Sequence, residues 1–428
     1  MDPITREEQL MAGEQLEPIT RKEYFLAKAA GMDVETPEPI TREEMFLSMI
    51  SGGGTGGSGG GIPSVSPKEV NFYDYDGTCL YAYTVEEAQA LTEMPPLPER
   101  KGLICQGWNW TLEDVKACNM AVDVGATYTT DDGTTRIYIT LQEGRTSPCL
   151  GVCPNGTVTV DWGDETAPDT LTGTSTSTVQ WTPNHEYAEP GDYVIRLTVD
   201  GEMGFTGTVS TNEGSCILRY SSSAEKRNLT YDRVVKKIEI GSGVTSIGDY
   251  SFARRPMLTS VVIPNSVTSV GKNAFYQCYA LTSVVIPNSV TSVGENAFYQ
   301  CYALTSVVIP NSVTRVDKYA FYYCNLTSLV IHNGVTSISG SFAFQFNHAL
   351  TYVFFPNSVT SIGANAFSGC AGVRIYDFSS HTIVPSMGGY NSFDGIQPDC
   401  EIRVPAALFN KWMTTNSWLD YQNNIVAV

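Results

Sequence analysis

A few residues that could bind metals lie near one another in this sequence. Cys149 and Cys153 are four residues apart, and His185 follows the acidic residues Asp161 and Asp164. A metal site at the two cysteines would need two more ligands, and none is found at a suitable spacing. The eleven cysteines are an odd number and contain no C-x-x-C pair, so neither a disulfide framework nor a zinc ribbon is implied. We predict no metal and no cofactor.

Residues 74–78, Asp-Tyr-Asp-Gly-Thr, follow a predicted strand and resemble the D-x-D-G-T motif of haloacid-dehalogenase-type phosphatases. In that family the first acid, here Asp74, attacks phosphorus, and the second, here Asp76, acts as the acid. The family also needs a doubly wound sheet, a downstream lysine and an acidic metal pair. Here one short predicted helix, 85–92, leads into three prolines between 95 and 98, which break the chain. We interpret Asp-Gly-Thr as a turn and predict no enzymatic activity; a phosphatase or glycan hydrolase is the remote alternative.

Charge and composition limit the classes of partner. The chain has 428 residues, enough for two to four domains, and a formal net charge of -19. Such a chain repels nucleic acid and anionic membranes unless it carries a basic run, and none is present. No apolar stretch approaches the roughly 18 residues of a membrane span, and the N-terminus does not have the pattern of a secretory signal. We expect no nucleic-acid partner and no membrane insertion.

The first 51 residues contain one phrase three times, at 2–8, 17–23 and 38–44. Each copy has Thr as a helix N-cap and Glu three residues later, which together form a capping box. The Ile before the cap can pack on Tyr24 in the second copy and on Met45 in the third, but the first copy has Gln9 at this position. Helices this short are marginal alone, so they must pack on each other or on a partner. The copies resemble N-terminal segments of phage virion proteins. The resemblance implies an anchor that docks to a capsid or tail protein, and a small helical bundle is the alternative. The docking residues would be Ile4, Thr5, Ile19, Thr20, Tyr24, Ile40, Thr41 and Met45.

The next segments are a Gly-rich linker and a small module. Residues 52–61 are almost all glycine, which is typical of a flexible linker. Residues 62–126 predict a small α+β module of unknown role, with Trp108 and Trp110 in its core. From 127 to 212 the sequence predicts only strands, at the spacing of a β-sandwich.

Four motifs within this β segment resemble the polycystic-kidney-disease-type (PKD) immunoglobulin-like domain. They are Val-Thr-Val-Asp-Trp-Gly-Asp at 158–164, His-Glu-Tyr at 185–187, Pro-Gly-Asp-Tyr at 190–193 and Leu-Thr-Val at 197–199. The resemblance implies that the tryptophan and tyrosine pack the core and that the domain is a spacer or adhesion module without catalysis. It also implies that His185 is a structural hydrogen-bond partner.

The strongest pattern is periodic. Pro-Asn-Ser-Val recurs from Pro264, Pro287, Pro310 and Pro356, and a degenerate copy begins at His332, with steps of 23, 23, 22 and 24 residues. A period in the twenties, with Leu, Val and Ile at fixed offsets, predicts a solenoid. Residues 296–310 closely resemble the BspA-type leucine-rich repeat, over about 241–400, and 404–418 resembles the terminal cap of that family. The resemblance implies a surface protein that works in adhesion and host contact.

The period also predicts inward columns. Phe275, Phe298, Phe321 and Phe367 should stack, with Phe342 or Phe344 filling the degenerate copy. A second column should contain reduced, buried thiols. Its members are Cys278, Cys301, Cys324 and Cys370, and Asn347 interrupts it.

Two outward columns are predicted to bind a partner. Tyrosines recur beside the inward cysteines, where exposed rings would suit stacking on sugars or on a flat protein surface, and solvated tyrosines are the alternative. These are Tyr276, Tyr279, Tyr299, Tyr302, Tyr322 and Tyr323. Apolar residues occupy the outward position of one strand in each coil. They could form a contact surface for a symmetry mate, a neighbouring domain or a receptor. The alternative is that branched residues are present because they favour strands. These are Val262, Val285, Val308, Val330 and Phe354.

These observations predict a mainly β, multidomain chain. Its parts would be short N-terminal helices (1–51), a Gly linker (52–61), a small α+β module (62–126), an immunoglobulin-like β-sandwich (127–212), a leucine-rich-repeat β-solenoid (213–400) and a C-terminal cap (401–428). The predicted function is a non-enzymatic phage virion appendage, like a head or tail fibre, that docks by its N-terminus. Its solenoid would adhere to a host surface glycan or protein. A homotrimer is one assembly that a fibre would suit, and a bacterial cell-surface adhesin is the alternative function.

Overall fold

The structure is a computed structural model that describes residues 68–428, apart from 75–78, 98, 101–102, 118–121, 131, 144–145, 207–216, 220–233, 339 and 390. The chain divides into two units, 1–63 and 64–428. The predicted anchor, its docking residues and the Gly linker lie outside the described residues, so those predictions stay predictions. None of the helices within the described ranges is long and apolar enough to cross a membrane.

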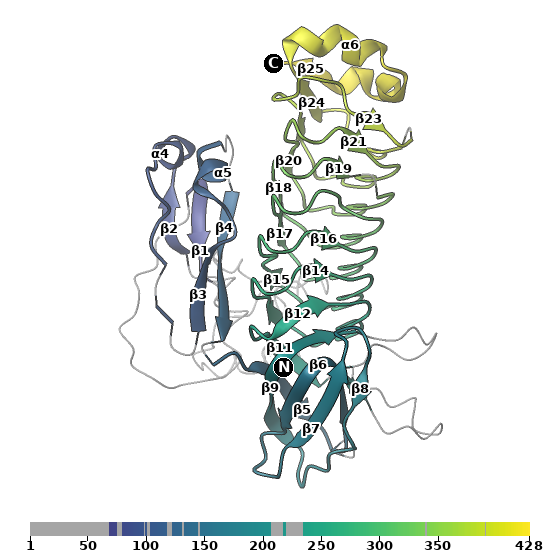
Figure 1. The fold of residues 1–428 in the computed structure, drawn as a ribbon. Helices are drawn as coiled ribbons and strands as arrows, with labels where there is room; N and C mark the ends of the chain where they lie inside the picture. The colour runs from purple at the N-terminus through teal and green to yellow at the C-terminus, as the bar shows by residue number, and fades with distance from the viewer. Residues whose placement is uncertain are drawn as a thin grey trace, which may run out of the picture. The chain divides into compact units, whose positions relative to one another are not determined.

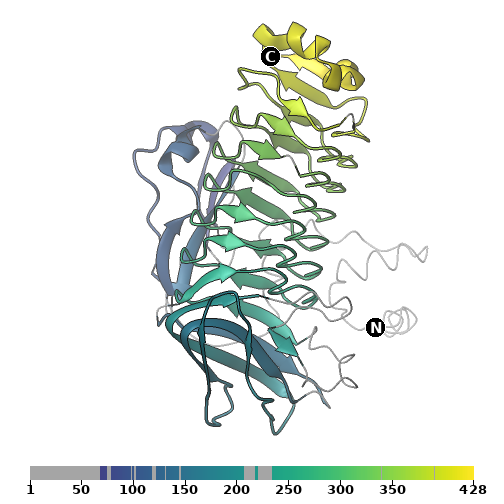
Figure 2. The same cartoon turned by 45° about the vertical axis from the view of Figure 1, so that its right-hand side comes forward.

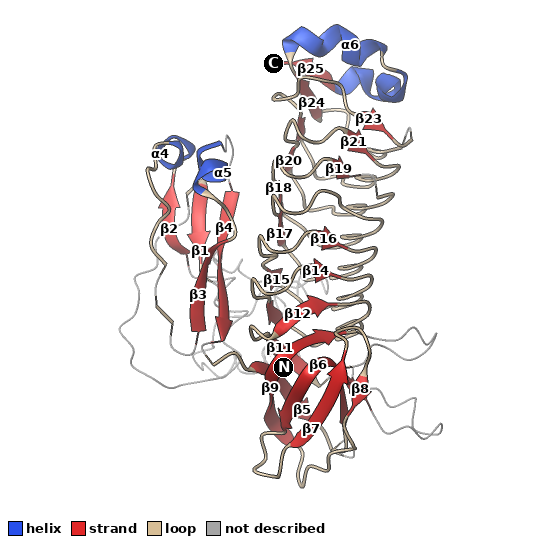
Figure 3. Cartoon of the chain, in the orientation of Figure 1, coloured by secondary structure: helices blue, strands red, loops and turns tan. Residues whose placement is uncertain are grey.

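The first described part is a small module with one four-stranded sheet and two short helices (Figure 3). The helix α4 (Val85–Gln89) begins at Thr84, whose side chain accepts a hydrogen bond from the Glu87 amide in a capping box. The helix α5 spans Leu112–Ala117. The strands lie in the order β2 (Cys79–Tyr83), β1 (Val70–Tyr73), β4 (Val122–Thr130) and β3 (Leu103–Trp108). As predicted, Trp108 and Trp110 are buried in the core of this module.

The second part is a β-sandwich whose core contains the motif residues. Trp162 and Tyr187 are buried, and the Tyr187 hydroxyl donates to the Trp162 carbonyl at 2.9 Å. His185 stacks on Trp162 with ring centroids 4.5 Å apart, and its Nε2 lies 2.7 Å from an Asp164 carboxylate oxygen. The structural interpretation of His185 is therefore confirmed, while the PKD resemblance stays a prediction. The strands are β5 (Thr135–Leu141), β6 (Cys149–Asp161), β7 (Asp169–Thr174), β8 (Gln180–Trp181), β9 (Gly191–Phe205) and β10 (Leu218–Arg219).

The sandwich and the solenoid share one sheet and one hydrophobic core. Strand β5 pairs antiparallel with β11 (Val235–Glu239), and β9 pairs in parallel with β12 (Val244–Ile247). These two pairings start the two strand rows of the solenoid, and the resulting sheet has twelve strands. The two parts, which the sequence separates at 212, are therefore continuous in their hydrogen bonding.

The solenoid stacks coil on coil, with one strand of each row in most coils (Figures 1 and 2). Strands in register are parallel and join equivalent residues, such as Ser260 with Ser283 and Val308 with Val330. The first row continues from β11 with β13 (Ser260–Val262), β15 (Ser283–Val284), β17 (Ser306–Ile309), β18 (Ser328–Ile331), β20 (Tyr352–Phe354), β22 (Ile375–Asp377), β24 (Glu401–Val404) and β25 (Ile425–Ala427). The second row continues from β12 with β14 (Ser269–Val270), β16 (Ser292–Val293), β19 (Ser337–Ile338), β21 (Ser361–Ile362) and β23 (Ser386–Met387).

The phenylalanine column forms as predicted. Phe275, Phe298 and Phe321 are fully buried, with ring centroids 5.1 Å apart in both pairs and ring planes within 6° of parallel. Phe344 continues the column to Phe367, whereas Phe342 stacks on Tyr319. One aromatic ring per coil thus fills the centre of the solenoid and fixes the distance between coils.

The cysteine column donates hydrogen bonds. Each thiol lies 3.1–3.2 Å from the carbonyl of the phenylalanine 26 residues earlier, as Cys301 does with Phe275. All nine described cysteines are free thiols, and burial raises the pKa of the Cys278, Cys324 and Cys370 thiols to about 12. Asn347 takes the cysteine position in the degenerate coil and donates to the equivalent carbonyl, that of Phe321, at 2.9 Å. The column therefore requires a donor that fits a small buried space.

The C-terminal residues close the last coil. The segment η2 (Ala406–Leu408) leads into helix α6 (Phe409–Thr414) and the 3-10 segment η3 (Asn416–Asn424). Trp412 and Trp418 are fully buried and both pack on Phe378. Their rings cover apolar residues that would otherwise meet water at the open end of a repeat array.

The role of Asn347 gives a stability prediction. Its side chain also donates to Phe344 and accepts from the Leu326 amide, so Asn347→Ala removes three buried hydrogen bonds, and of the three partners only the Phe344 carbonyl keeps a second donor, the Cys370 thiol. We expect a loss of about 2–3 kcal/mol in the free energy of unfolding. Asn347→Cys restores the donor of the other coils and should lose less. Urea unfolding followed by fluorescence measures both, and an alanine variant as stable as the cysteine variant would contradict this role.

Candidate functional site

The tyrosines form two ordered columns along the solenoid. Tyr276, Tyr299 and Tyr322 are half-buried and stacked, with centroids 4.9 and 4.7 Å apart. Tyr279 and Tyr302 are exposed and stacked at 5.2 Å. The prediction that these residues lie at the surface is confirmed by their exposure, and their use in binding stays a prediction.

The stacking decides which part of each ring a partner can reach. The stacked ring planes lie within 12° of parallel, so Tyr299 has both faces covered by its neighbours, while Tyr302 has one face on Tyr279. Between the columns, the Gln277 amide donates to Gln300 at 2.9 Å. Tyr323 ends the exposed column, because its ring is turned 73° from that of Tyr302. We call the set Tyr276, Gln277, Tyr279, Tyr299, Gln300, Tyr302, Tyr322 and Tyr323 the tyrosine ladder. It presents ring edges, hydroxyls and amides.

The outward apolar column is covered by the small module of the same chain. A side chain at Gly125 on β4 would lie 3.2 Å from Val285, and Val308 and Val330 pack in the core of the module. Val330 is only 3% exposed. The sequence allowed a symmetry mate, a neighbouring domain or a receptor as the partner of this column, and in the structure the partner is the neighbouring domain. An open receptor site at these three valines is therefore wrong, while Val262 and Phe354 are half-buried.

Polar contacts at both ends of this interface fix its register. Gln106 on β3 accepts from the Asn265 amide at 2.6 Å, and the Asp114 carboxylate accepts from Asn311 at 2.7 Å. Asp114 also lies 3.6 Å from Nδ1 of the buried His332, whose ring meets the edge of Trp110 at 4.1 Å. Burial disfavours the charge of Asp114, but the nearby His332 and hydrogen bonds from Thr111 and Asn311 outweigh it and hold the pKa of this carboxyl well below its usual range.

The periodic part of the chain matches one known family. Residues 226–342 and 339–393 match the family described as BspA type Leucine rich repeat region, in six copies. Residues 226–393 are a leucine-rich repeat region of the BspA type. The predicted repeat family is thereby confirmed for this part of the chain. No curated protein matches the chain.

Solved structures of leucine-rich repeat proteins are similar to this chain. One from Bacteroides ovatus is 22% identical, with 49% of this chain and 56% of that chain covered and a TM-score of 0.34. A leucine rich cell surface protein from Faecalibacterium prausnitzii is 28% identical, with 39% and 52% covered and a TM-score of 0.27. One from T. pallidum is 24% identical, with 34% and 56% covered and a TM-score of 0.24. The chain spans about half the length of each.

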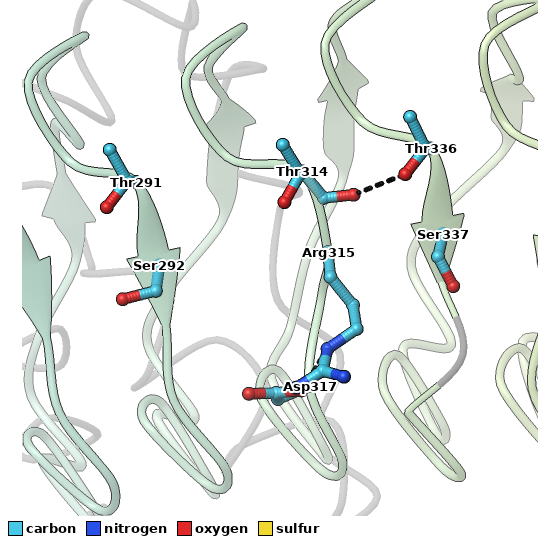
Figure 4. A pocket seen from close by; sticks show the side chains of 7 residues that line it. All are labelled: Thr291, Ser292, Thr314, Arg315, Asp317, Thr336 and Ser337. Atoms are coloured by element: carbon cyan, nitrogen blue, oxygen red, sulfur yellow. Dashed lines mark hydrogen bonds and ion pairs between the residues drawn. The ribbon is translucent and has the colours of Figure 1, made fainter.

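A shallow polar hollow lies on the second strand row of the BspA-type solenoid (Figure 4). Its volume is about 340 Å³, and it is lined by hydroxyls and one ion pair, Arg315 with Asp317 at 2.8 Å. The Thr336 hydroxyl donates to the Thr314 carbonyl at 3.1 Å. The hollow can form hydrogen bonds with a polar partner. The hydroxyl side chains are those of Thr291, Ser292, Thr314, Thr336 and Ser337.

The residues that resembled a phosphatase motif are not arranged for attack. Asp74 is buried and forms a salt bridge with Arg100, and its carboxylate is also hydrogen-bonded to Tyr128. A nucleophile held this way has no open face toward a substrate. Asp76 lies outside the described residues. Among the residues that the structure describes, no group of three His, Cys, Asp or Glu side chains could hold a metal ion.

The sequence interpretation missed the interface residues and the ion pair in the hollow. Three of these residues occupy places where a coil departs from the repeat. His332 stands where other copies have proline, Arg315 where they have serine, and Asp317 where they have glycine. These departures were the signal that the sequence offered. A surface position that differs from the same position in other coils can indicate a contact with a residue outside its own coil.

Charge at the valine column should separate the module from the solenoid. Val285→Lys places an ammonium group against the backbone of Gly125, where burial without a partner is costly. We expect faster amide hydrogen exchange in β4 and altered Trp110 fluorescence, with the solenoid still folded. Thr291→Lys on the second row is the matched control and should change neither. Unchanged exchange in the Val285→Lys variant would show that the interface does not depend on this contact.

Acid should weaken the same interface through Asp114. Because the folded-state pKa of this carboxyl is lowered, its contribution is complete above the ordinary aspartate pKa and is lost as the pH falls below it. Hydrogen exchange in α5 should therefore rise between neutral pH and about pH 3, after correction for the intrinsic rate. Asp114→Asn should weaken docking at neutral pH and flatten this dependence. Glu113→Gln, at the exposed neighbouring position, is the control that should keep the wild-type profile.

Proposed function

We propose that this chain is a non-enzymatic adhesion protein that is displayed on a surface and binds its target through the solenoid. The BspA-type repeat region supports an adhesion-type role. The observation that carries the proposal is the tyrosine ladder, in which Tyr279, Tyr302 and Tyr323 are 38–41% exposed on a rigid array. Tyrosine is enriched at protein interfaces because it has a large amphipathic surface and few rotatable bonds. Stacking restricts those bonds further, so little conformational entropy remains to be lost on binding.

The solenoid faces differ in what they can offer a target. The module covers part of the first strand row, which removes the middle of the valine column from the accessible surface. The tyrosine ladder and the polar hollow lie on other parts of the coil and are accessible. We therefore assign target binding to the ladder, with the hollow as a second contact region.

The display surface is a bacterial cell or a phage particle. The repeat family favours a cell-surface adhesin. A virion appendage rests on the three N-terminal capping boxes, which lie outside the described residues. Immunogold labelling of the native protein on cells and on purified particles separates the two, since gold on particles alone would contradict the adhesin and gold on cells alone would contradict the appendage.

The adhesion proposal predicts a loss of binding without a loss of stability. Beads that carry the full chain are incubated with intact cells of candidate hosts and with mucin-coated plates. Tyr279→Ala combined with Tyr302→Ala should reduce bound beads about tenfold, which corresponds to about 1.4 kcal/mol. The thermal midpoint should change little, because an aromatic pair at the surface contributes only about 0.5–1.5 kcal/mol.

The control is Ile383→Ala, which truncates an exposed apolar side chain outside the ladder. It should bind as the wild type does. Unchanged adhesion of the double tyrosine variant would contradict the proposal, whether or not the midpoint of thermal unfolding is lowered, and would assign the rings to packing.

A further inference from the structure

The chemistry of the tyrosine ladder identifies the kind of target. A sugar ring that stacks on an aromatic residue places its C–H groups on the ring face, where the π-electron density is negative. Both faces of Tyr299 are covered, because it lies between Tyr276 and Tyr322 at 4.9 and 4.7 Å, and the exposed Tyr302 has one face on Tyr279 and meets Tyr323 edge to face. The exposed parts are the ring edges, which are electropositive, and the hydroxyls, which can donate. Such a surface favours hydrogen-bond acceptors and anions.

The charge around the ladder points the same way. The chain carries a net charge of -19, yet residues 249–348 contain five basic and three acidic side chains. Two of these acids are bound to basic partners, Glu295 to Lys272 and Asp317 to Arg315. Arg255 is buried, which leaves Arg254 and Lys318 as the exposed basic side chains of these coils that have no salt-bridge partner among the described residues.

Cationic groups lie at both ends of the ladder. Arg254 is exposed one coil before Gln277, and its charge opposes the effect of burial, which raises the pKa of the Tyr279 hydroxyl. Within the described residues Arg254 has no salt-bridge partner. Lys318 lies 5.0 Å from the Tyr319 ring, which packs on Tyr322, and the exposed His348 contacts Tyr323.

The spacing of the ladder matches a polymer. One tyrosine per coil and column gives a donor every 4.7–5.2 Å along the solenoid axis. This is about the length of one sugar unit in an extended polysaccharide, whereas an extended peptide advances only about 3.3 Å per residue. A polysaccharide can therefore place one unit on each coil in register, and a peptide strand cannot.

We infer that the tyrosine ladder binds an extended anionic polysaccharide with carboxylated sugars, which lies along the solenoid axis and accepts hydrogen bonds from the tyrosine hydroxyls. This inference rests on the proposed adhesion function and names its target class. Arg254 binds a carboxylate at one end of the ladder. The ring edges contact the sugar rings from the side, without face stacking.

The test uses three probes of matched length on the full chain: polygalacturonate, its fully methyl-esterified form and poly-L-glutamate. Isothermal titration should show binding of polygalacturonate and at least tenfold weaker binding of the neutral ester. Tyr279→Phe combined with Tyr302→Phe keeps both rings and removes two donors. It should weaken polygalacturonate binding about tenfold if each hydroxyl contributes an ordinary hydrogen bond. Arg254→Gln should weaken it too, and 0.5 M salt should weaken it in the wild type by screening, with roughly a 4–5 Å Debye length.

Matched controls separate the ladder from general charge and ring effects. Tyr250→Phe removes a hydroxyl one coil before the ladder, and Arg374→Gln removes an exposed guanidinium that is paired with Asp399 elsewhere on the solenoid. Both should bind polygalacturonate as the wild type does.

Three results would overturn the inference. Equal binding of the ester and of the phenylalanine variant would mean stacking on a neutral sugar. Tighter binding of poly-L-glutamate would mean an acidic protein target. No binding of any probe would reject this target class. The adhesion proposal would not be affected by that result, because it is tested separately by the binding of beads that carry the alanine variants to cells.

Discussion

Each coil of the solenoid hydrogen-bonds to the next through residues one repeat apart, and most of the structure follows from this constraint. The Thr282 amide donates to the Thr259 carbonyl and the Thr291 amide to the Thr268 carbonyl, 23 residues earlier in both cases. A coil can join this ladder only if equivalent residues arrive at the same place, and the spacing of the repeat stays within one residue of 23 from Pro264 to Pro356. Every residue of the repeat thereby becomes a member of a column. One phenylalanine in each repeat therefore gives a stacked aromatic core along the solenoid, and one tyrosine in each repeat gives a continuous row of rings on its surface.

The same constraint explains how the repeat tolerates exceptions. Where the degenerate coil replaces cysteine by Asn347, the amide supplies the donor that the column needs, so the interior is satisfied by a different group. Where it replaces proline by His332, the reason lies outside the coil, in the contact with Trp110 and Asp114 of the module. The inward substitution preserves the packing of the coil, and the outward substitution forms a contact with the module. One degenerate coil therefore contains both kinds within sixteen residues.

Sequence periodicity was sufficient for the solenoid and insufficient for its surroundings. The inward columns could be predicted because apolar residues at a fixed offset must face the core. The alternation that placed Val284 inside and Val285 outside was also correct. What covers Val285 could not be predicted, because the contact joins it to Gly125, 160 positions earlier, and no local pattern records such a pairing. The orientation of the tyrosines was also beyond the sequence, since the same spacing allows rings that lie flat on the surface and rings that stack on each other. Only the stacked arrangement hides the ring faces and changes the chemistry of the target.

The shared sheet between the sandwich and the solenoid has a consequence for how the array comes into being. Strands β5 and β9 each offer one open edge to the first coil, and these edges already carry the twist and spacing that the coil must adopt. The first coil can thus form on a finished template and escapes the entropic cost of nucleating an isolated turn, and each later coil forms on the one before it. The array would grow in one direction, away from the sandwich. While the array grows, the newest coil has an unpaired strand edge that can pair with another chain. This edge is covered when the cap, with the buried Trp412 and Trp418, folds onto the final coil.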